Sequence, residues 1–328
     1  EICDLAHAAM GERRCGFEEV AYLLLSGELP DREELAEFAA LLNDHMDLEH
    51  KTLLNIIELE GNNIMNILAR SVLELYTFDD QPDDISRANL MRQSGSFIAN
   101  LPTTIAYAYN MLRHQHGRNM HIRHPQPGLS IAENFLYMLK GPGRYTDLET
   151  RTLDGGANIE VAQMVRHLKE AIADWTDERA IADYLLRMAR KEAYDQTGLI
   201  YGLGHAVYTV SDPRAILLKE MARQLAEEKD RVDEFEFLER LERLGIEAVY
   251  AVKGKGKRIC ANVDFYSGFV YDLIGIPEAI YTPLFAMSRI VGWCAHRNEE
   301  LNISGRRIIR PAYRCVAEPL DYLPIEER

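Results

Sequence analysis

The sequence has few cysteines, no long uncharged apolar run and no excess of positive charge. Its five cysteines are an odd, scattered set without a C-x-x-C spacing, so they indicate reduced thiols, neither a disulfide framework nor a zinc site. No stretch approaches the roughly 18 uncharged apolar residues that span a bilayer. The first residues lack the basic-then-apolar order of a signal peptide and begin as if within an element, without an initiator Met. These absences predict a cytoplasmic protein.

The charge balance limits the partners that the chain can have. Its 328 residues include 37 Lys+Arg against 52 Asp+Glu, which gives a formal net charge of −15. Nucleic acids and anionic membranes require clustered positive charge, so neither is the expected partner. An anionic ligand must therefore bind in a local basic pocket.

Apolar residues recur at helical spacing along most of the chain and strand signals are few, so the sequence predicts a mainly α fold. The expected helices cover residues 17–25, 32–46, 63–76, 86–112, 130–139, 159–173, 178–191, 213–228, 234–244 and 281–296, and a further helix begins near Phe265. Pro102 predicts a kink or break near Leu101. Connectors rich in glycine or containing proline, at 198–208, 253–268 and 305–315, are the expected places for chemistry because loops on a rigid scaffold commonly carry it.

Arg289 is the only fully charged side chain in the helical segment 281–296, and Phe285 and Trp293 are its neighbours one turn away. An unpaired buried charge costs several kcal/mol. The guanidinium must therefore reach solvent, pair with an internal acid, or bind an anionic ligand.

His205 follows Gly202 and Gly204 in a loop that is not a dinucleotide fingerprint, because the third glycine is missing. The glycines let a ligand approach the backbone, and the imidazole can act as an acid or hydrogen-bond donor near neutral pH. A structural histidine is the alternative. Arg214, at a helix start that Pro213 initiates, has a fork suited to a bidentate carboxylate.

Asp264 places one carboxylate between apolar residues in the segment NVDFYSG. Burial of that kind raises the pKa of an Asp and makes it a stronger base. The alternative is that Asp264 caps the helix that begins near Phe265.

A basic spot precedes Asp264 in this acidic chain, formed by Lys253, Lys255, Lys257 and Arg258. Its glycines suit a phosphate-bearing ligand, and a solvated loop is the alternative. The histidines in RHQHGRNMHIRH look like metal ligands, but they are interleaved with arginines and have no Cys or acid partner at ligand spacing. No metal site is therefore expected at His114, His116, His121 and His124.

Taken together and in order, these motifs resemble the citrate synthase family. The resemblance rests on GFEEVAYLLLSGELP, ISRANLMRQSGSFIANLPTTIAYAY, ENFLYML, GGANIEV, GLGHAVYTVSDPR, NVDFYSG, FAMSRIVGWCAH and IIRPAY, which span essentially the whole chain. The joint occurrence of G-x-G-H-x-V-Y, D-P-R and N-V-D-x-x-S-G is highly specific.

The resemblance implies a two-domain helical fold, with a large domain from 1–155 and 269–328, a small domain from 156–268, and a homodimer. It implies the acyl transfer of citrate synthase in the tricarboxylic acid cycle: acetyl-CoA condenses with oxaloacetate, and the citryl thioester is hydrolysed. The coenzyme A thioester is a substrate, and no cofactor is implied. 2-Methylcitrate synthase, which uses propionyl-CoA, is the close alternative because one methylene is worth only about 1–3 kcal/mol.

Position by position, the resemblance implies a role for each site residue. Asp264 matches the base that removes a methyl proton, and His205 matches the donor to the oxaloacetate carbonyl. Three arginines match those that hold the substrate carboxylates, the last reaching across from the partner subunit: Arg214, Arg289 and Arg310. Four residues match the region that contacts coenzyme A: Lys253, Lys255, Lys257 and Gly204.

The chain departs from the family at one point. In the family, the G-G-A-N motif follows a histidine that stabilises the enol, whereas in this chain Asp154 stands before Gly155. The helix pair that carries an (A/D)-H-E motif in the family is also missing from this chain. Either a segment of a longer protein is left out between Asp154 and Gly155 and the numbering is continuous across the gap, or the deletion is genuine and the protein is a non-catalytic ligand-binding relative. The first is favoured because a packed core rarely survives the loss of whole helices. It predicts that residues 154 and 155 lie much farther apart than the roughly 3.8 Å of a trans peptide link.

Overall fold

The computed structural model describes residues 16–59, 61–153, 159–205, 208, 210–256 and 258–302. The regular elements of these residues are helices, and an isolated antiparallel bridge joins Leu203 to Ala261. The helices are α2 (Phe17–Ser26), α3 (Arg32–Asp44), α4 (His50–Glu58), α5 (Ile64–Phe78), α6 (Arg87–Gln115), α7 (Ile131–Lys140), α8 (Asp147–Leu153), α9 (Ile159–Ala171), α10 (Glu178–Ala189), α11 (Pro213–Glu228), α12 (Val232–Lys253), α13 (Asp264–Ile274), η1 (Glu278–Ile280) and α14 (Tyr281–Asn302). The expected mainly α fold is confirmed.

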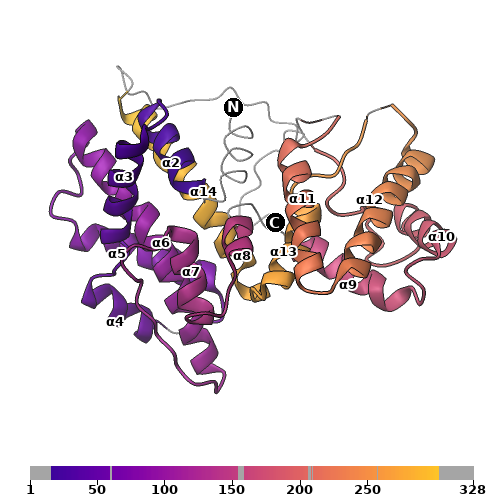
Figure 1. Cartoon of the computed structure of the whole chain (residues 1–328), viewed down its shortest axis with the longest axis horizontal. Helices are drawn as coiled ribbons and strands as arrows, with labels where there is room; N and C mark the ends of the chain where they lie inside the picture. The colour runs from indigo at the N-terminus through magenta and orange to yellow at the C-terminus, as the bar shows by residue number, and fades with distance from the viewer. Residues whose placement is uncertain are drawn as a thin grey trace, which may run out of the picture.

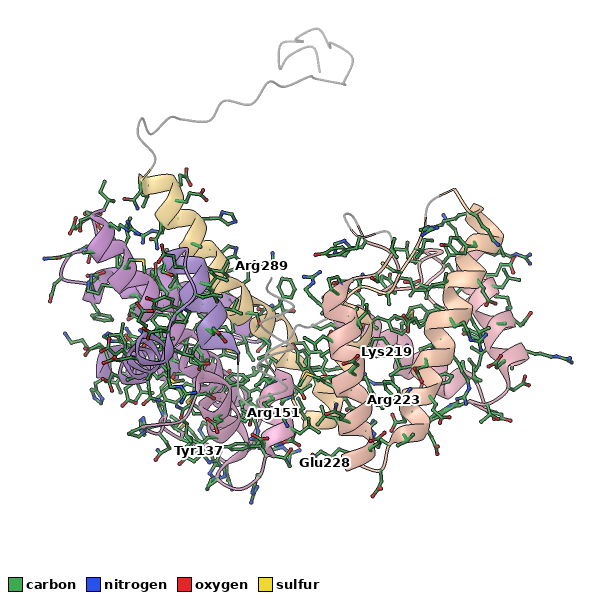
Figure 2. The ribbon with its side chains drawn as sticks, turned by 45° about the horizontal axis from the view of Figure 1, so that its top comes forward. Tyr137, Arg151, Lys219, Arg223, Glu228 and Arg289 are labelled. Carbon is green, nitrogen blue, oxygen red and sulfur yellow. The ribbon has the colours of Figure 1, made fainter. Side chains whose placement is uncertain are left out.

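The helices form two groups, as Figure 1 shows. In one group α6 packs against α3, α4, α5, α7 and α14, and in the other α12 packs against α10 and α11. Helix α13 packs on α9 and α11, and α8 contacts α7, α11 and α13, so α8 and α13 lie where the groups meet. Figure 2 shows this junction, with Arg151 of α8 between Tyr137 of α7 and Glu228 of α11.

The sequence predicts a kink or break near Leu101; helix α6 runs through Pro102 without interruption, so a break there is excluded. Proline inside a helix removes a backbone hydrogen bond and costs about 3 kcal/mol. Leu101, Pro102 and Thr103 are all buried, and the Thr103 hydroxyl donates to the Met46 carbonyl oxygen at 2.8 Å. Packing on five other helices therefore outweighs the local preference.

Helix α12 extends to Lys253, nine residues beyond the expected end at Leu244. Gly245 lies inside it, where a Cβ atom would come within 2.8 Å of Leu203 Cδ1. The glycine therefore serves a close approach between α12 and the loop that precedes His205. The short helices α4 and α8 were not expected.

A buried carboxylate ties the two groups together. Glu149 of α8 is 2% exposed, and its oxygens accept from Lys140 Nζ at 2.7 Å and from Lys229 Nζ at 2.6 Å. Lys140 Nζ also donates to the carbonyl oxygen of Ile274, at the end of α13, at 2.9 Å. Burial alone would raise the pKa of Glu149, but the two ammonium groups hold it below its usual value.

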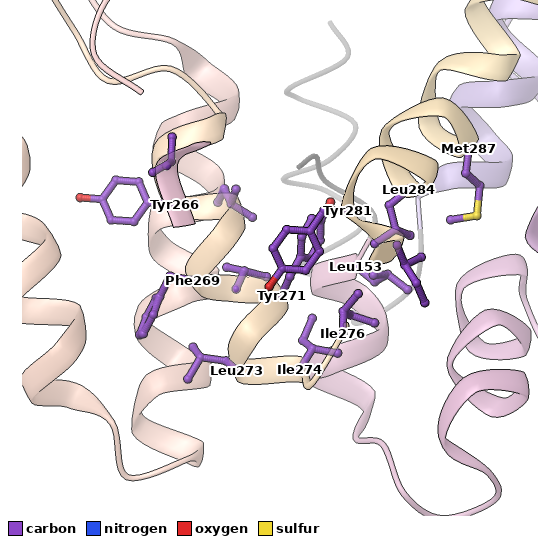
Figure 3. Packing of buried hydrophobic residues seen from close by; sticks show 14 of the residues in the cluster. Leu153, Tyr266, Phe269, Tyr271, Leu273, Ile274, Ile276, Tyr281, Leu284 and Met287 are labelled. Carbon is purple, nitrogen blue, oxygen red and sulfur yellow. The ribbon is translucent and has the colours of Figure 1, made fainter. Parts of the chain in front are cut away.

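Helix α13 supplies the apolar centre between the groups (Figure 3). Tyr271 is 1% exposed and its ring centroid lies 5.1 Å from that of Tyr281, the first residue of α14. Leu153 at the end of α8 and Leu284 of α14 are buried in the same cluster. Among the described helices, none is both long and apolar enough to cross a bilayer.

We expect Glu149→Gln to lower the free energy of unfolding by up to about 3–5 kcal/mol, because the two lysines lose a buried counter-charge. Since the folded-state pKa lies below the ordinary 4.5, the carboxylate stabilises the fold above that pH and ceases to do so as the pH falls through the folded-state pKa. The deficit of the variant should therefore shrink below about pH 4.5. Urea unfolding across pH measures both effects.

The matched control is Asp147→Asn on the same helix. Asp147 pairs with Arg151 at 3.1 Å, but its side chain is 71% exposed. This variant should cost less than about 1 kcal/mol. Equal losses in the two variants would contradict the role given to Glu149.

Candidate functional site

Two loops far apart in the sequence are paired by their backbones. Gly204 N donates to the Cys260 carbonyl oxygen at 2.7 Å, and Asn262 N donates to the Gly202 carbonyl oxygen at 2.9 Å, on either side of the Leu203–Ala261 bridge. The pairing brings the segment before His205 alongside the segment that enters α13. His205 and Asp264 are thereby held in one region of the molecule.

Glycine is required at two positions of this pairing. Gly202 has φ +82°, and a Cβ atom there would lie 2.8 Å from Phe265 Cδ2 and 2.9 Å from Phe265 Cα. Gly204 has φ +100° but faces open space. Gly202 therefore permits contact between two backbones, and Gly204 permits the turn that leads to His205.

The two ring nitrogens of His205 have different neighbours. Nδ1 accepts from the backbone N–H of Tyr208 at 3.0 Å, so the neutral ring carries its proton on Nε2. Nε2 lies 3.3 Å from Arg214 Nη2, and the Tyr208 ring lies 4.7 Å from the imidazole. In this tautomer Nε2–H and the guanidinium are both donors, so they are neighbours that do not bond to each other and can face the same acceptor.

Arg214 forms a bidentate pair with Asp212, which the sequence analysis did not assign. Arg214 Nε and Nη2 donate to Asp212 Oδ1 and Oδ2 at 3.1 and 2.9 Å. The Asp212 side chain is fully buried, whereas that of Arg214 is 52% exposed. Burial raises the pKa of Asp212, but Arg214 outweighs it and holds that pKa below its usual value. The sequence shows Asp212 as an N-cap before an N1 proline, and this pattern predicts the cap but not the pairing with Arg214.

Asp264 is the first residue of α13 and does not cap it. The Asn262 side chain takes that part, because its Oδ1 accepts from Asp264 N at 3.0 Å. Burial raises the pKa of Tyr271, and the nearby charges of Tyr281 and Asp264 raise it further. The carboxylate of Asp264 also acts on Arg214, whose pKa is raised first by its hydrogen bond to Asp212.

A carboxylate on α12 holds the two helices that carry the site. Glu242 Oε2 accepts from Lys219 Nζ of α11 at 2.8 Å and from the Tyr266 hydroxyl of α13 at 2.5 Å. Burial, and then Glu242, raise the pKa of Tyr266, so its hydroxyl remains a donor. Figure 2 shows Lys219 on α11, the helix that carries Arg214 in its first turn.

The other expected site residues lie apart from this group. Arg289 is exposed on α14, with its guanidinium 4.4 Å from the Phe285 ring centroid, so it reaches solvent across an aromatic face (Figure 2). Among the described residues, no hydrogen bond or ion pair joins it to His205 or Arg214. Lys253 and Lys255 are exposed beside the turn after α12. Lys257, Arg310 and the 154–155 junction lie outside the described residues.

Within the described ranges, no group of three or more His, Cys, Asp or Glu side chains could hold a metal ion. Three of the four histidines at 114–124 have hydrogen-bond partners in neighbouring parts of the chain, and His114 Nδ1 lies 3.2 Å from the Arg118 carbonyl oxygen. His124 Nδ1 lies 2.8 Å from the Tyr107 hydroxyl, and His116 Nδ1 lies 2.7 Å from the Leu112 carbonyl oxygen.

Comparison with known proteins gives a consistent result. The family model "Citrate synthase, C-terminal domain" matches residues 1–154 and 150–312. Citrate synthase of Synechocystis is 32% identical, with 95% of this chain and 84% of the relative covered. Citrate synthase of Corynebacterium glutamicum is 28% identical, with 100% and 82% covered. A citrate synthase structure from Thermoplasma acidophilum, a ternary complex with carboxymethyl coenzyme A and oxaloacetate, has a TM-score of 0.71 at 24% identity, covering 98% of this chain and 91% of that one.

The same comparisons bear on the expected missing section. The alignment with the Corynebacterium relative runs over 380 positions, more than the 328 residues of this chain, so the relative has residues for which this chain has none. The two matched ranges of the family model meet at residues 150–154. That position agrees with the interruption expected between Asp154 and Gly155.

Gly202→Ala should destabilise the protein more than Gly204→Ala. Both substitutions place alanine at positive φ, which costs about 1–2 kcal/mol, but only the first also forces a methyl group into Phe265, at about 1–3 kcal/mol more. Urea unfolding midpoints of the two variants measure the difference. Equal losses would show that the close approach to Phe265 is relaxed at little cost.

Proposed function

This chain belongs to the citrate synthase family, a family of acyltransferases, and from that premise we propose how its residues condense acetyl-CoA with oxaloacetate and hydrolyse the citryl thioester. The observation that carries the proposal is the pairing of a donor and a cation: His205 Nε2 lies 3.3 Å from Arg214 Nη2. Oxaloacetate has a ketone oxygen on the carbon next to a carboxylate. A proton donor beside a guanidinium therefore suits both groups at once.

His205 polarises the ketone in this proposal. Its Nδ1 is engaged by the Tyr208 N–H, so Nε2–H is the ring group that faces the substrate oxygen. As the new carbon–carbon bond forms, negative charge develops on that oxygen, and a fixed donor stabilises the charge. Proton transfer from Nε2 then leaves a hydroxyl group on the product.

Asp264 removes the methyl proton of acetyl-CoA. A carbon acid beside a thioester is far weaker than a carboxylic acid, and each pKa unit of difference costs about 1.4 kcal/mol. Asp264 therefore acts together with a donor that stabilises the enol oxygen. The resemblance gives this part to the histidine that precedes G-G-A-N in the family; in the given sequence Asp154 stands before Gly155, at the interruption expected there.

The remaining carboxylates of the substrate are assigned to Arg289 and to Arg310 of the partner subunit in a homodimer. In this proposal the large domain comprises 1–155 and 269–328, and the small domain comprises 156–268. The packing of α10 and α11 on α12 supports the small domain. The boundary between the two domains falls within α13. Arg289 on α14 and Arg214 on α11 then come from different domains, and closure of the domains would bring them to one dianion.

Coenzyme A is assigned to the loop after α12 and to Gly204. The exposed ammonium groups of Lys253 and Lys255, together with Lys257, suit its phosphates. The Thermoplasma complex holds oxaloacetate and carboxymethyl coenzyme A, and this supports oxaloacetate and a coenzyme A derivative as the ligands. The proposed reaction needs no metal or other cofactor. A cytoplasmic location is supported by the free thiols of Cys260 and Cys294.

The test is release of free thiol from acetyl-CoA by the purified full-length protein, with and without oxaloacetate. We expect release that depends on oxaloacetate and is faster with acetyl-CoA than with propionyl-CoA. Faster release with propionyl-CoA would assign 2-methylcitrate synthase instead. Binding of oxaloacetate without any thiol release would identify a non-catalytic relative.

Asp264→Asn should lower kcat by about 10²–10⁴-fold and leave oxaloacetate affinity nearly unchanged, because the amide cannot accept the methyl proton. His205→Ala should weaken both turnover and oxaloacetate binding. Thiol-release kinetics together with calorimetric titration of oxaloacetate separate the two effects. Near-normal turnover by Asp264→Asn would refute its role as the base.

A further inference from the structure

We propose that Asn262 is a positioning residue that fixes His205 relative to Asp264; the inference rests on the roles proposed for those two residues. Asn262 Nδ2 donates to the Gly204 carbonyl oxygen at 3.1 Å, and Asn262 Oδ1 accepts from Asp264 N at 3.0 Å. One amide thus joins the peptide immediately before His205 to the first residue of α13.

The backbone of Asn262 is held as firmly as its side chain. Its N–H donates to the Gly202 carbonyl oxygen at 2.9 Å, and its own carbonyl oxygen accepts from Phe265 N at 3.1 Å. The side chain therefore acts from a fixed point. Because an amide offers both a donor and an acceptor, it can hold a carbonyl and an N–H simultaneously.

Gly204 explains why this link is needed. At φ +100° and without a side chain, Gly204 is the flexible point of the loop. The peptide before Gly204 is fixed by the bond from Gly204 N to the Cys260 carbonyl oxygen at 2.7 Å. The peptide after it, which leads into His205, is fixed at its carbonyl by Asn262. Removing the amide removes the hydrogen bond at that carbonyl oxygen.

The two proposed catalytic groups act on different substrates, so their separation sets the distance between the enol carbon and the ketone carbon. A misplacement of about 1 Å costs on the order of 10²-fold in rate. Loss of the Asn262 link should therefore appear mainly in kcat. Binding of oxaloacetate should change less, because Arg214 is held independently by Asp212.

The experiment compares Asn262→Ser, Asn262→Ala and Asn262→Asp in the full-length protein. Serine can still accept from Asp264 N but is too short for Gly204, and alanine loses both bonds. Aspartate keeps the shape and the acceptor but lacks the donor, and it carries the test if the smaller residues impair folding. Each variant is assayed for oxaloacetate-dependent thiol release, for oxaloacetate affinity by calorimetry, and for its melting temperature.

Asn134→Ser is the matched control. Asn134 is buried at the start of α7, where its Nδ2 donates to the Gln126 and Leu129 carbonyl oxygens at 3.1 and 3.2 Å and its Oδ1 accepts from Gln126 N at 2.7 Å. It makes the same kind of link between a loop and a helix start, in the other helix group. We expect this control to lower the melting temperature and to leave kcat within about twofold of the wild type.

For Asn262→Ser we expect a fall in kcat of about 10–100-fold and a change in oxaloacetate affinity below about threefold. In a His205→Ala background the same substitution should cost much less, because residues that act together are not additive. If the substitution lowers kcat just as much in the His205→Ala background, Asn262 does not act through His205. If the folded Asn262 variants keep kcat near the wild-type value while Asp264→Asn is inactive, Asn262 has no positioning role. Either result would overturn the role of Asn262 and leave the proposed function standing. Absence of thiol release from the wild type would instead overturn the proposed function.

Discussion

The arrangement of the site depends on the backbone pairing between residues 202–204 and 260–262. Gly204 N donates to Cys260 and Asn262 N donates to Gly202, so two segments separated by more than fifty residues in sequence share one short ladder. The pairing needs close approach on two sides. Gly202 admits Phe265 from one side, and Gly245 of α12 admits Leu203 from the other. The glycines thus make room for contact between elements that local propensity would keep apart.

Charge is distributed so that an acidic chain retains a cationic point at this ladder. Asp212 is buried and neutralises part of the Arg214 field, while the half-exposed guanidinium keeps its other side toward solvent. In the proposed function, a substrate carboxylate would meet an arginine whose position is already fixed by Asp212, and little side-chain entropy would be lost on binding. Arg289 differs, because its guanidinium lies over Phe285 on an exposed helix face and has no acidic partner in the described part of the chain.

Helical spacing and caps predicted most helices to within a few residues. Asp31 forms the capping box that opens α3, and Pro213 begins α11 as expected. The errors came from tertiary contacts: Gly245 continues a helix because Leu203 packs against it, and Pro102 lies within α6 because that helix is buried on several sides.

The site shows the same difference between local sequence signals, which were predicted, and tertiary contacts, which were not. Sequence motifs made His205, Arg214 and Asp264 candidates, but the residues alone left a structural histidine and a helix cap open, and the resemblance to the family favoured the ligand roles. The structure places His205 beside Arg214 and shows that Asp264 does not cap α13. The partners that hold them were missed, because Asp212 and Asn262 look like ordinary cap and turn residues until the loops are paired. The exposure of Arg289 likewise depends on how α14 packs, which its own residues do not determine.

The shared carboxylate of Glu149 has a mechanical consequence. Lys140 is the last residue of α7 and belongs to the helix group of α6, and Lys229 lies at the end of α11 in the other group. Both ammonium groups pair with the carboxylate of Glu149. If the groups rotate about that point, both ion-pair distances are preserved; if they slide past each other, at least one pair must break in a buried setting. Glu149 is therefore placed so that rotation of the two helix groups about it would keep both ion pairs, whereas translation would not.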